Sequence, residues 1–391
     1  MIDPDSDPIV GQTDDEPAPR SRSLGGWLKA IGAMLVLLVA AGGFLTFGNE
    51  SPNNSTAPAT TITSVGTSPS VSAIAKRVGA ATVDILSSNA YTGSADAGTG
   101  MILTPNGEVL TNNHVIAGGT TITARVDGVG ARYKAKVVGV DPAMDVAVLQ
   151  LQGASGLPVV PLGNSATVKV GEAVVAIGNA LNLSGTPTVT SGTISALGRS
   201  VAAGDPATGS VEHLTGMLQT DAVLEPGNSG GPLVGANGQV IGMNTAAATG
   251  GFSNSPASTV GFAIPINRAL AIVRAIMRRK VGAGIELGPP PFIGVEVENL
   301  SMAGAGYFGY VPPASSGVFV AGVFPDTPAA ANGMRAGDVI TSLGGRQVAS
   351  IAGLSATMRR YHPGNKISIT WVGPFGGNHS AQITLAAGPA A

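Results

Sequence analysis

The sequence predicts a mainly β protein of at least two domains, preceded by one membrane-spanning helix. Three observations lead to this fold class. From about Ser72 onward, short runs rich in Val and Ile are separated by Gly, Asn and Pro. A Gly-Pro-Pro-Pro sequence at residues 288–291 divides the chain, and residues 30–48 carry no charge at all. A chain of 391 residues has room for two or three domains of roughly 100–200 residues each.

Composition excludes several classes of protein. The formal net charge is −2, so nothing in the overall charge favours a nucleic-acid partner. The chain has no cysteine and only four histidines, which argues against disulfides, thiolate metal sites and a His-rich metal centre. We therefore expect neither a metal nor a cofactor.

Residues 30–48 have the length of a membrane anchor. At a rise of about 1.5 Å per residue, such a helix nearly spans a ~30 Å hydrocarbon core. Arg20, Arg22 and Lys29 precede the segment and Glu50 closely follows it. By the positive-inside rule, residues 1–29 form a disordered cytoplasmic tail and the rest lies outside the membrane. A cleavable signal peptide is the alternative, although its charged leader would be long and no clear Ala-x-Ala site follows.

Beyond this segment the chain divides into a linker and two domains. Residues 49–70 are rich in Ser, Thr, Pro and Asn, which is typical of a flexible linker. Residues 71–288 form the first predicted domain and residues 289–391 the second. Short apolar runs in the first domain predict the strands of a β-barrel or sandwich: 82–86, 100–103, 109–111, 136–140, 146–151 and 173–177. One amphipathic pattern predicts a helix over residues 266–280.

The glycine-flanked Ser229 is the candidate nucleophile. A serine hydroxyl needs an adjacent base, and an attacked carbonyl needs hydrogen-bond donors where its oxygen becomes negative. A glycine two residues before the serine lets the backbone turn its N–H groups outward. We therefore place an oxyanion hole at residues 227–229, namely Gly227, Asn228 and Ser229, with the N–H groups of Gly227 and Ser229 as donors.

His114 is the candidate general base. It follows small and polar residues and precedes the apolar Val115, which predicts a position at the mouth of a barrel. His213 lies beside a Gly/Ser-rich loop and is interpreted as a polar surface or core residue without a catalytic role. The base requires a buried carboxylate that fixes its tautomer. Asp145 precedes an apolar run and is favoured over Asp141, which precedes Pro142 and has the character of a turn residue.

These motifs resemble the HtrA/Deg serine proteases, and the predicted anchor together with the Gly- and Ala-rich, Lys-poor composition favours a membrane-anchored, bacterial member of that family. The resemblance is carried by Thr-Asn-Asn-His-Val-Ile at residues 111–116, by Asp-Val-Ala-Val-Leu at 145–149, and by Gly-Asn-Ser-Gly-Gly-Pro-Leu at 227–233. It covers roughly residues 70–388 and implies a trypsin-like double β-barrel protease domain followed by one PDZ domain. The implied activity is that of a serine endopeptidase acting on misfolded or exported proteins, in protein quality control and the stress response. Family members are often trimers, so a homotrimer is also implied.

The second domain resembles a PDZ domain. Its cues include Phe-Ile-Gly-Val at residues 292–295 and the run 333–340. By resemblance, the carboxylate-binding loop for peptide C-termini consists of Phe292, Ile293, Gly294 and Val295. Backbone N–H groups in a glycine-containing turn can bind a terminal carboxylate while the peptide adds as a strand.

Specificity and rival functions follow from the same residues. In trypsin-like folds the residue six positions before the nucleophile lies at the base of the specificity pocket. Here that residue is Val223, and Leu224 follows it. The resemblance therefore predicts that the substrate residue before the scissile bond has a small or medium aliphatic side chain. Asp221 is an alternative lining residue. A chaperone or docking scaffold with a weakly active protease domain is the rival hypothesis, and the complete set of His, Asp and Ser argues against it.

Overall fold

The structure is a computed structural model, and it describes residues 69–179, 185–204, 211–245, 260–280, 282, 284–300 and 312–391. The predicted tail, membrane segment and nearly all of the linker lie outside the described residues. Within those ranges no helix is both long and apolar enough to cross a membrane.

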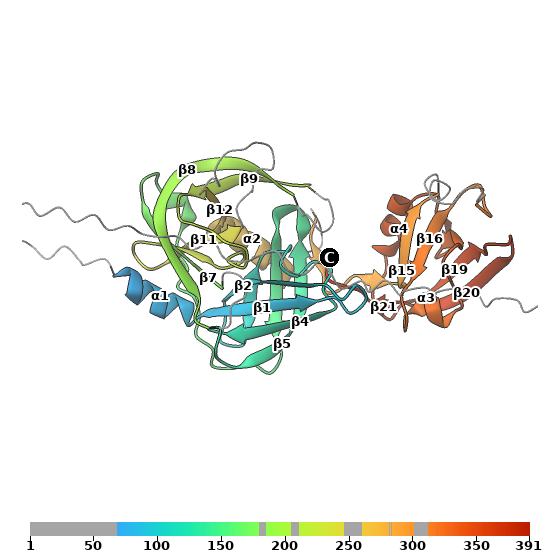
Figure 1. Ribbon diagram of the computed structural model, residues 1–391, viewed down its shortest axis with the longest axis horizontal. Coiled ribbons are helices and arrows are strands. Elements are labelled where there is room, and N and C mark those ends of the chain that lie inside the picture. Colours follow the sequence, from blue (N-terminus) through green and yellow to red (C-terminus); the bar gives the residue numbers. More distant parts are fainter. Residues whose placement is uncertain are drawn as a thin grey trace, which may run out of the picture. The chain divides into compact units, whose positions relative to one another are not determined.

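Six antiparallel strands form the first barrel (Figure 1). In chain order they are β1 (Thr82–Ser88), β2 (Ala95–Ile102), β3 (Glu108–Thr111), β4 (Thr121–Val126), β5 (Arg132–Asp141) and β6 (Val146–Leu151). The sheet order is β5-β4-β1-β2-β3-β6, and pairing between β5 and β6 closes the ring. The short strand β13 (Glu286–Leu287) adds to β5. A 3₁₀ turn, η1 (Pro142–Met144), connects β5 to β6.

A second closed barrel follows, with the order β10-β11-β12-β9-β8-β7. Its strands are β7 (Ala173–Gly178), β8 (Thr188–Gly204), β9 (Val211–Thr220), β10 (Pro232–Gly235), β11 (Val240–Thr245) and β12 (Gly261–Pro265). The 3₁₀ turn η2 (Ser165–Thr167) lies before β7. Thus β10 and β11 follow directly on the segment that carries Ser229.

Branched aliphatic side chains fill both barrels, as strand propensity predicts. The first interior contains Val83, Ile85 and Leu149, and the second contains Val174, Ile194 and Leu233. A third cluster joins residues of both barrels to two helices, α1 (Val71–Gly79) and α2 (Ile266–Met277). Helix α2 buries Ile266, Ala269, Val273 and Ile276, which share one face of the helix.

The C-terminal part forms a separate antiparallel sheet with the order β15-β16-β17-β19-β20. Its elements are β14 (Pro291–Phe292), β15 (Val295–Asn299), β16 (Val318–Val323), α3 (Pro328–Ala331), β17 (Val339–Leu343), β18 (Arg346–Gln347), α4 (Ile351–Met358), β19 (Lys366–Val372), β20 (Asn378–Thr384) and β21 (Ala386–Ala387). Strand β15 has a neighbour on one side only, so its other edge is unpaired within the described residues.

The mainly β prediction is confirmed, with differences of detail. The run at 146–151 has the predicted limits, whereas β2 begins at Ala95, five residues before the predicted 100–103. The helix predicted over 266–280 ends at Met277. Helices α1, α3 and α4 were not predicted. Each is short, with nine, four and eight residues respectively, and begins at a Ser or Thr cap. Their amphipathic periodicity is too brief to distinguish from strand patterns.

Candidate active site

A hydrogen bond links the ring of His114 to the buried carboxylate of Asp145. The ring Nδ1 lies 2.9 Å from Oδ2 and 3.0 Å from Oδ1 of Asp145. The backbone N–H of His114 also donates to Oδ1, at 3.0 Å. The Asp145 side chain has no exposed area, whereas that of His114 is 35% exposed. The Nδ1 edge of the imidazole is thus held by Asp145, while part of the ring remains accessible to a substrate.

The backbone at Asp145 is in the left-handed region, with φ of 53°. This conformation directly follows η1 and turns the Asp145 carboxylate toward the end of β3. Asp141 has a different role, because its side chain accepts a hydrogen bond from the backbone N–H of Met144 at 3.2 Å and caps η1. Burial raises the pKa of Asp141, against the opposing effect of the backbone hydrogen bonds from Met144 and Ala143. The structure therefore brings Asp145, and not Asp141, to His114.

Asn112 supports the same carboxylate and was missed as a functional residue by sequence reasoning. Its side-chain amide nitrogen lies 2.9 Å from Oδ2 of Asp145 and 3.0 Å from the Asp145 carbonyl oxygen. The same nitrogen lies 3.2 Å from the hydroxyl oxygen of Thr245, at the end of β11 in the other barrel. Asn112 is fully buried. No signal in the sequence distinguishes Asn112, because Thr111 and Asn113 on either side of it are also polar.

The segment carrying Ser229 is tightly constrained. Gly227 has φ of 97° and Gly230 has φ of 84°, values that favour glycine. A Cβ on Gly230 would lie 2.0 Å from the carbonyl oxygen of Thr99. The N–H of Asn228 donates to the carbonyl of Glu225 at 3.0 Å, so Asn228 cannot offer this group to a substrate. The N–H of Gly227 has no partner among the described residues, as an oxyanion donor requires.

Thr99 on β2 holds both ends of this segment. Its N–H donates to the carbonyl of Ser229 at 2.8 Å, and its hydroxyl donates to the carbonyl of Gly227 at 2.8 Å. The neighbouring Gly98 is flanked by the side chain of Val115 and the carbonyl of Ser229. The residue after His114 and the backbone of Ser229 therefore meet at the same glycine.

The predicted specificity residues lie on the segment before this loop. Val223 is 43% exposed, and its carbonyl accepts a hydrogen bond from the hydroxyl of Thr190 at 2.8 Å. Leu224 packs against Gly261. The carboxylate of Asp221 accepts hydrogen bonds from the N–H and the hydroxyl of Thr193, which lower its pKa. The role of Val223 and Leu224 in specificity stays a prediction.

A second candidate site lies at the loop between β14 and β15. Gly294 has φ of 89°, and a Cβ there would lie 2.1 Å from Cβ of Thr327. The carbonyls of Ile293 and Gly294 accept hydrogen bonds from the N–H groups of Ala329 and Phe324. The N–H groups of Ile293 and Gly294 have no partner among the described residues. These two donors lie beside the unpaired edge of β15, as the binding of a terminal carboxylate requires.

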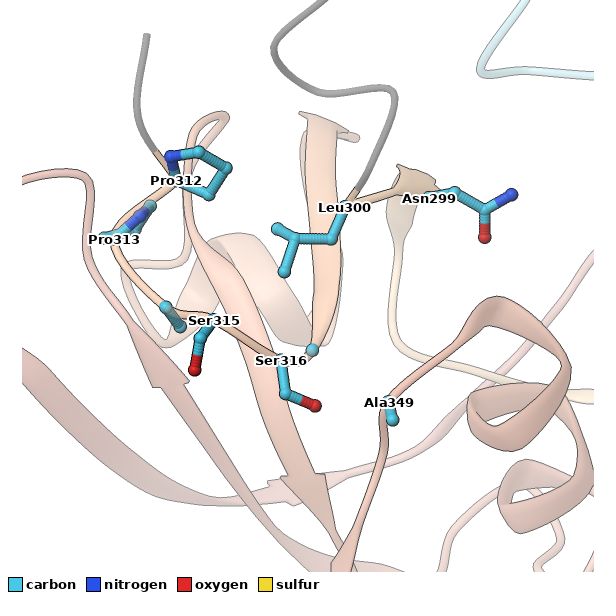
Figure 2. Close-up of a pocket in the computed structure, with 9 residues that line it drawn as sticks. Asn299, Leu300, Pro312, Pro313, Ser315, Ser316 and Ala349 are labelled. Atoms are coloured by element: carbon cyan, nitrogen blue, oxygen red, sulfur yellow. The ribbon is translucent and has the colours of Figure 1, made fainter.

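A cavity of about 650 Å³ lies at the opposite end of β15. Figure 2 shows that its walls come from the end of β15, the segment before β16 and the residue preceding the α4 cap. The lining residues are Asn299, Leu300, Pro312, Pro313, Ala314, Ser315, Ser316, Gly317 and Ala349. None of these described lining residues is charged.

The fold and the site together define a class of protein. Two six-stranded barrels with a His–Asp pair on one and a glycine-flanked serine beside the other are the architecture of a trypsin-like peptidase. The family model of the trypsin-like peptidase domain matches residues 98–243, and the family model of the PDZ domain matches residues 291–372. The chain belongs to the HtrA family of serine proteases.

Several relatives are similar to most of this chain. Periplasmic serine endoprotease DegP of Salmonella typhimurium is 39% identical over 274 residues, which are 70% of this chain and 53% of DegP. Serine protease PepD of Mycobacterium tuberculosis is 35% identical over 306 residues, 74% of this chain and 61% of PepD. The solved HtrA-type protease AlgW with tripeptide is 33% identical, with 82% of this chain and 98% of that one covered and a TM-score of 0.46. The chain thus spans just over half the length of DegP.

Replacing Asn112 by alanine should lower kcat with little change in KM, because Asp145 loses a side-chain donor but the substrate-binding surface is unaltered. The loss should be about 10- to 100-fold, the equivalent of one charge-assisted hydrogen bond of about 1.5–3 kcal/mol. Steady-state hydrolysis of a casein-derived peptide measures both constants. Asn237→Ala, in an exposed turn, is the control and should leave kcat unchanged. An Asn112→Ala protein with wild-type kcat would show that the amide does not position Asp145.

Proposed function

We propose that this chain is a serine endopeptidase in which Ser229 is the nucleophile, His114 the general base and Asp145 the carboxylate that orients the base. The observation that carries this proposal is the bond between Nδ1 of His114 and a fully buried Asp145. A carboxylate on Nδ1 fixes the tautomer whose Nε2 accepts a proton, and it stabilises the imidazolium that forms.

The reaction proceeds in two half-reactions. His114 takes the hydroxyl proton of Ser229 as the oxygen attacks the scissile carbonyl carbon, and the tetrahedral oxyanion accepts hydrogen bonds from the N–H groups of Gly227 and Ser229. Protonated His114 then delivers the proton to the leaving amine, which gives an acyl-enzyme. Water, deprotonated by His114, attacks the ester and releases Ser229. None of these steps requires a metal or cofactor.

The proposed substrates are unfolded or exported proteins outside the cytoplasmic membrane. Support comes from the names of the relatives, since DegP is called a periplasmic serine endoprotease. The apolar, uncharged residues 30–48 support a single-pass anchor with residues 1–29 in the cytoplasm. In the same proposal, residues 49–70 are a linker, residues 71–288 the protease domain and residues 289–391 the PDZ domain. The proposed assembly is a homotrimer.

The second domain is proposed to bind peptide C-termini. A peptide that pairs antiparallel with β15 would direct its terminal carboxylate to the N–H groups of Ile293 and Gly294. Phe292 and Val295 flank these donors, and Val295 begins the strand that the peptide would extend. Residues further from the peptide's C-terminus would then lie toward Asn299.

The nucleophile is tested by Ser229→Ala. This change should abolish both casein hydrolysis and labelling by a fluorophosphonate probe, with the melting temperature preserved, because the hydroxyl adds little packing. Loss of one triad member typically costs several orders of magnitude in rate. Ser195→Ala, a serine on β8, is the control and should keep labelling. Near-normal hydrolysis by Ser229→Ala would refute the proposed nucleophile. A wild-type protein that binds unfolded protein without labelling would favour the scaffold hypothesis.

The choice of carboxylate is tested by a matched pair of variants. Asp145→Asn should lower kcat by about 10⁴ at neutral pH, because the amide favours the wrong imidazole tautomer. Asp141→Asn removes a charge from the same turn and should change kcat by less than about threefold, since a helix-capping role affects stability by only ~1 kcal/mol. Peptide hydrolysis at pH 7.5 compares the two. The reverse ranking would assign the triad carboxylate to Asp141.

Peptide binding at the second domain is tested in the full chain by fluorescence polarisation. A labelled peptide with a free C-terminal carboxylate should bind at least about tenfold more tightly than its C-terminal amide, because a charge-assisted hydrogen bond contributes about 1.5–3 kcal/mol. Gly294→Ala should remove this difference, since a Cβ would be forced against Thr327. Gly376→Ala is the control, because that glycine also has positive φ but no neighbour within 4 Å of its Cβ position. Equal binding of both peptides would contradict the assignment.

A further inference from the structure

An acidic side chain lies outside the first barrel's apolar interior in a position that the proposed mechanism does not use. Asp84 is in the middle of β1, between the buried Val83 and Ile85. In the strand register it is directly opposite Thr99 on β2 and Arg125 on β4. Side chains of directly opposed residues lie on the same face of a sheet. Asp84 therefore shares its face with the threonine that holds the Ser229 segment.

The carboxylate lies in an incompletely satisfied polar pocket. The cavity has a volume of about 210 Å³, and Asp84, Arg125, Arg132 and Asn179 are among its lining residues. Oδ1 of Asp84 and Nε of Arg125 are both buried, and neither has a hydrogen-bond partner among the described residues. Leaving buried polar atoms unsatisfied costs free energy. Stability alone thus gives no reason for an aspartate at this position.

Burial raises the pKa of Asp84 to about 6. A hydrogen bond from the side chain of Asn179 and the positive charge of Arg125 oppose this shift, while the charge of Asp127 adds to it. Arg132 of β5 also lines the cavity. The carboxyl therefore changes charge within the pH range in which a protease of this kind is assayed.

The cavity that Asp84 lines is connected through Asn179 and Thr99 to the candidate oxyanion hole. Asp84 and Asn179 line the same cavity, and the backbone N–H of Asn179 donates to the hydroxyl of Thr99 at 2.9 Å. That hydroxyl donates to the carbonyl of Gly227. The preceding Gly178 packs so closely that a Cβ would lie 2.7 Å from Cα of Asn228. A displacement of Asn179 would therefore be transmitted to the loop at residues 227–229.

We propose that Asp84 is a positioning residue for the hydrolytic reaction, acting through Asn179 and Thr99 on the loop that carries Gly227 and Ser229. The inference rests on the proposed function. An ionised carboxylate accepts a charge-assisted hydrogen bond from Asn179, roughly twice as strong as the bond to a neutral acid, and it attracts Arg125. Ionised Asp84 thus holds Asn179, and with it the loop, more firmly than the protonated acid does.

The test is the ratio of kcat for the wild type to kcat for Asp84→Asn, measured on one peptide substrate from pH 5 to pH 8. Asparagine has the shape of the protonated acid but does not titrate. The ionisation of His114 affects both proteins and cancels in the ratio. The ratio should rise from about one to about ten with a midpoint near pH 6, and KM should not change. This effect is smaller than the 10²–10³ expected for removal of a direct oxyanion donor.

Two further variants separate positioning from a general effect of charge. Asp127→Asn removes the same charge near the same pocket while leaving Asp84 beside Asn179, and its ratio should be about one at pH 8, where Asp84 is ionised in both proteins. Asn179→Ala should lower kcat by a similar factor, and adding Asp84→Asn to it should have little further effect, because both act along one path. Since burial disfavours the charged carboxylate, Asp84→Asn should not lower the melting temperature at pH 7.

The outcomes are distinguishable from failure of the proposed function. Two results with an active wild-type protein would overturn the positioning role alone. One is a kcat ratio that does not change with pH. The other is an effect of Asp84→Asn on kcat that is equally large in the presence and absence of Asn179. A wild-type protein without serine-dependent activity would overturn the proposed function and the positioning role with it.

Discussion

The buried carboxylate of Asp145 is the constraint on which the rim of the first barrel depends. A charge withdrawn from water must be compensated by donors, and here these are the ring and backbone N–H of His114 and the amide of Asn112. The donors lie at the end of β3 and the acceptor at the start of β6. Pairing of Thr111 with Ala147 brings the two strand ends together. The left-handed backbone at Asp145 then completes the geometry.

Polar contacts between the barrels give this rim its catalytic potential. Apolar packing alone would allow the two barrels to shift slightly against each other, whereas hydrogen bonds fix direction and distance. Asn112 reaches Thr245 of β11, and Thr99 of β2 binds both ends of the Ser229 segment. Gly98 and Gly230 allow the backbones to approach closely. Such preorganisation determines how well donors meet a developing oxyanion.

A glycine and a threonine also fix the candidate binding loop of the C-terminal sheet. Gly294 allows the loop before β15 to pack against Thr327, whose hydroxyl also caps α3. Because the carbonyls on this loop bond inward, its N–H groups are left for a ligand. In both candidate sites, then, glycine at positive φ exposes backbone donors while a threonine on a neighbouring segment fixes the loop. Asp84 adds a titratable group to one of these supports, which links the rigidity of the loop to pH.

The sequence by itself determined the mainly β fold, because strand alternation acts locally. Local proline and glycine patterns predicted a boundary near residue 288, and local motifs predicted His114, Asp145 and Ser229 as candidate catalytic residues. Even the preference for Asp145 over Asp141 followed from adjacent residues. Only the tertiary structure decided which distant groups support them. Asn112 and Thr99 derive their importance from hydrogen-bond partners 33 and 128 positions away, and Asp84 derives its importance from a cavity that it shares with the distant Asn179. Their neighbours in sequence carry no trace of those contacts, since strand pairing and barrel closure alone bring such residues together.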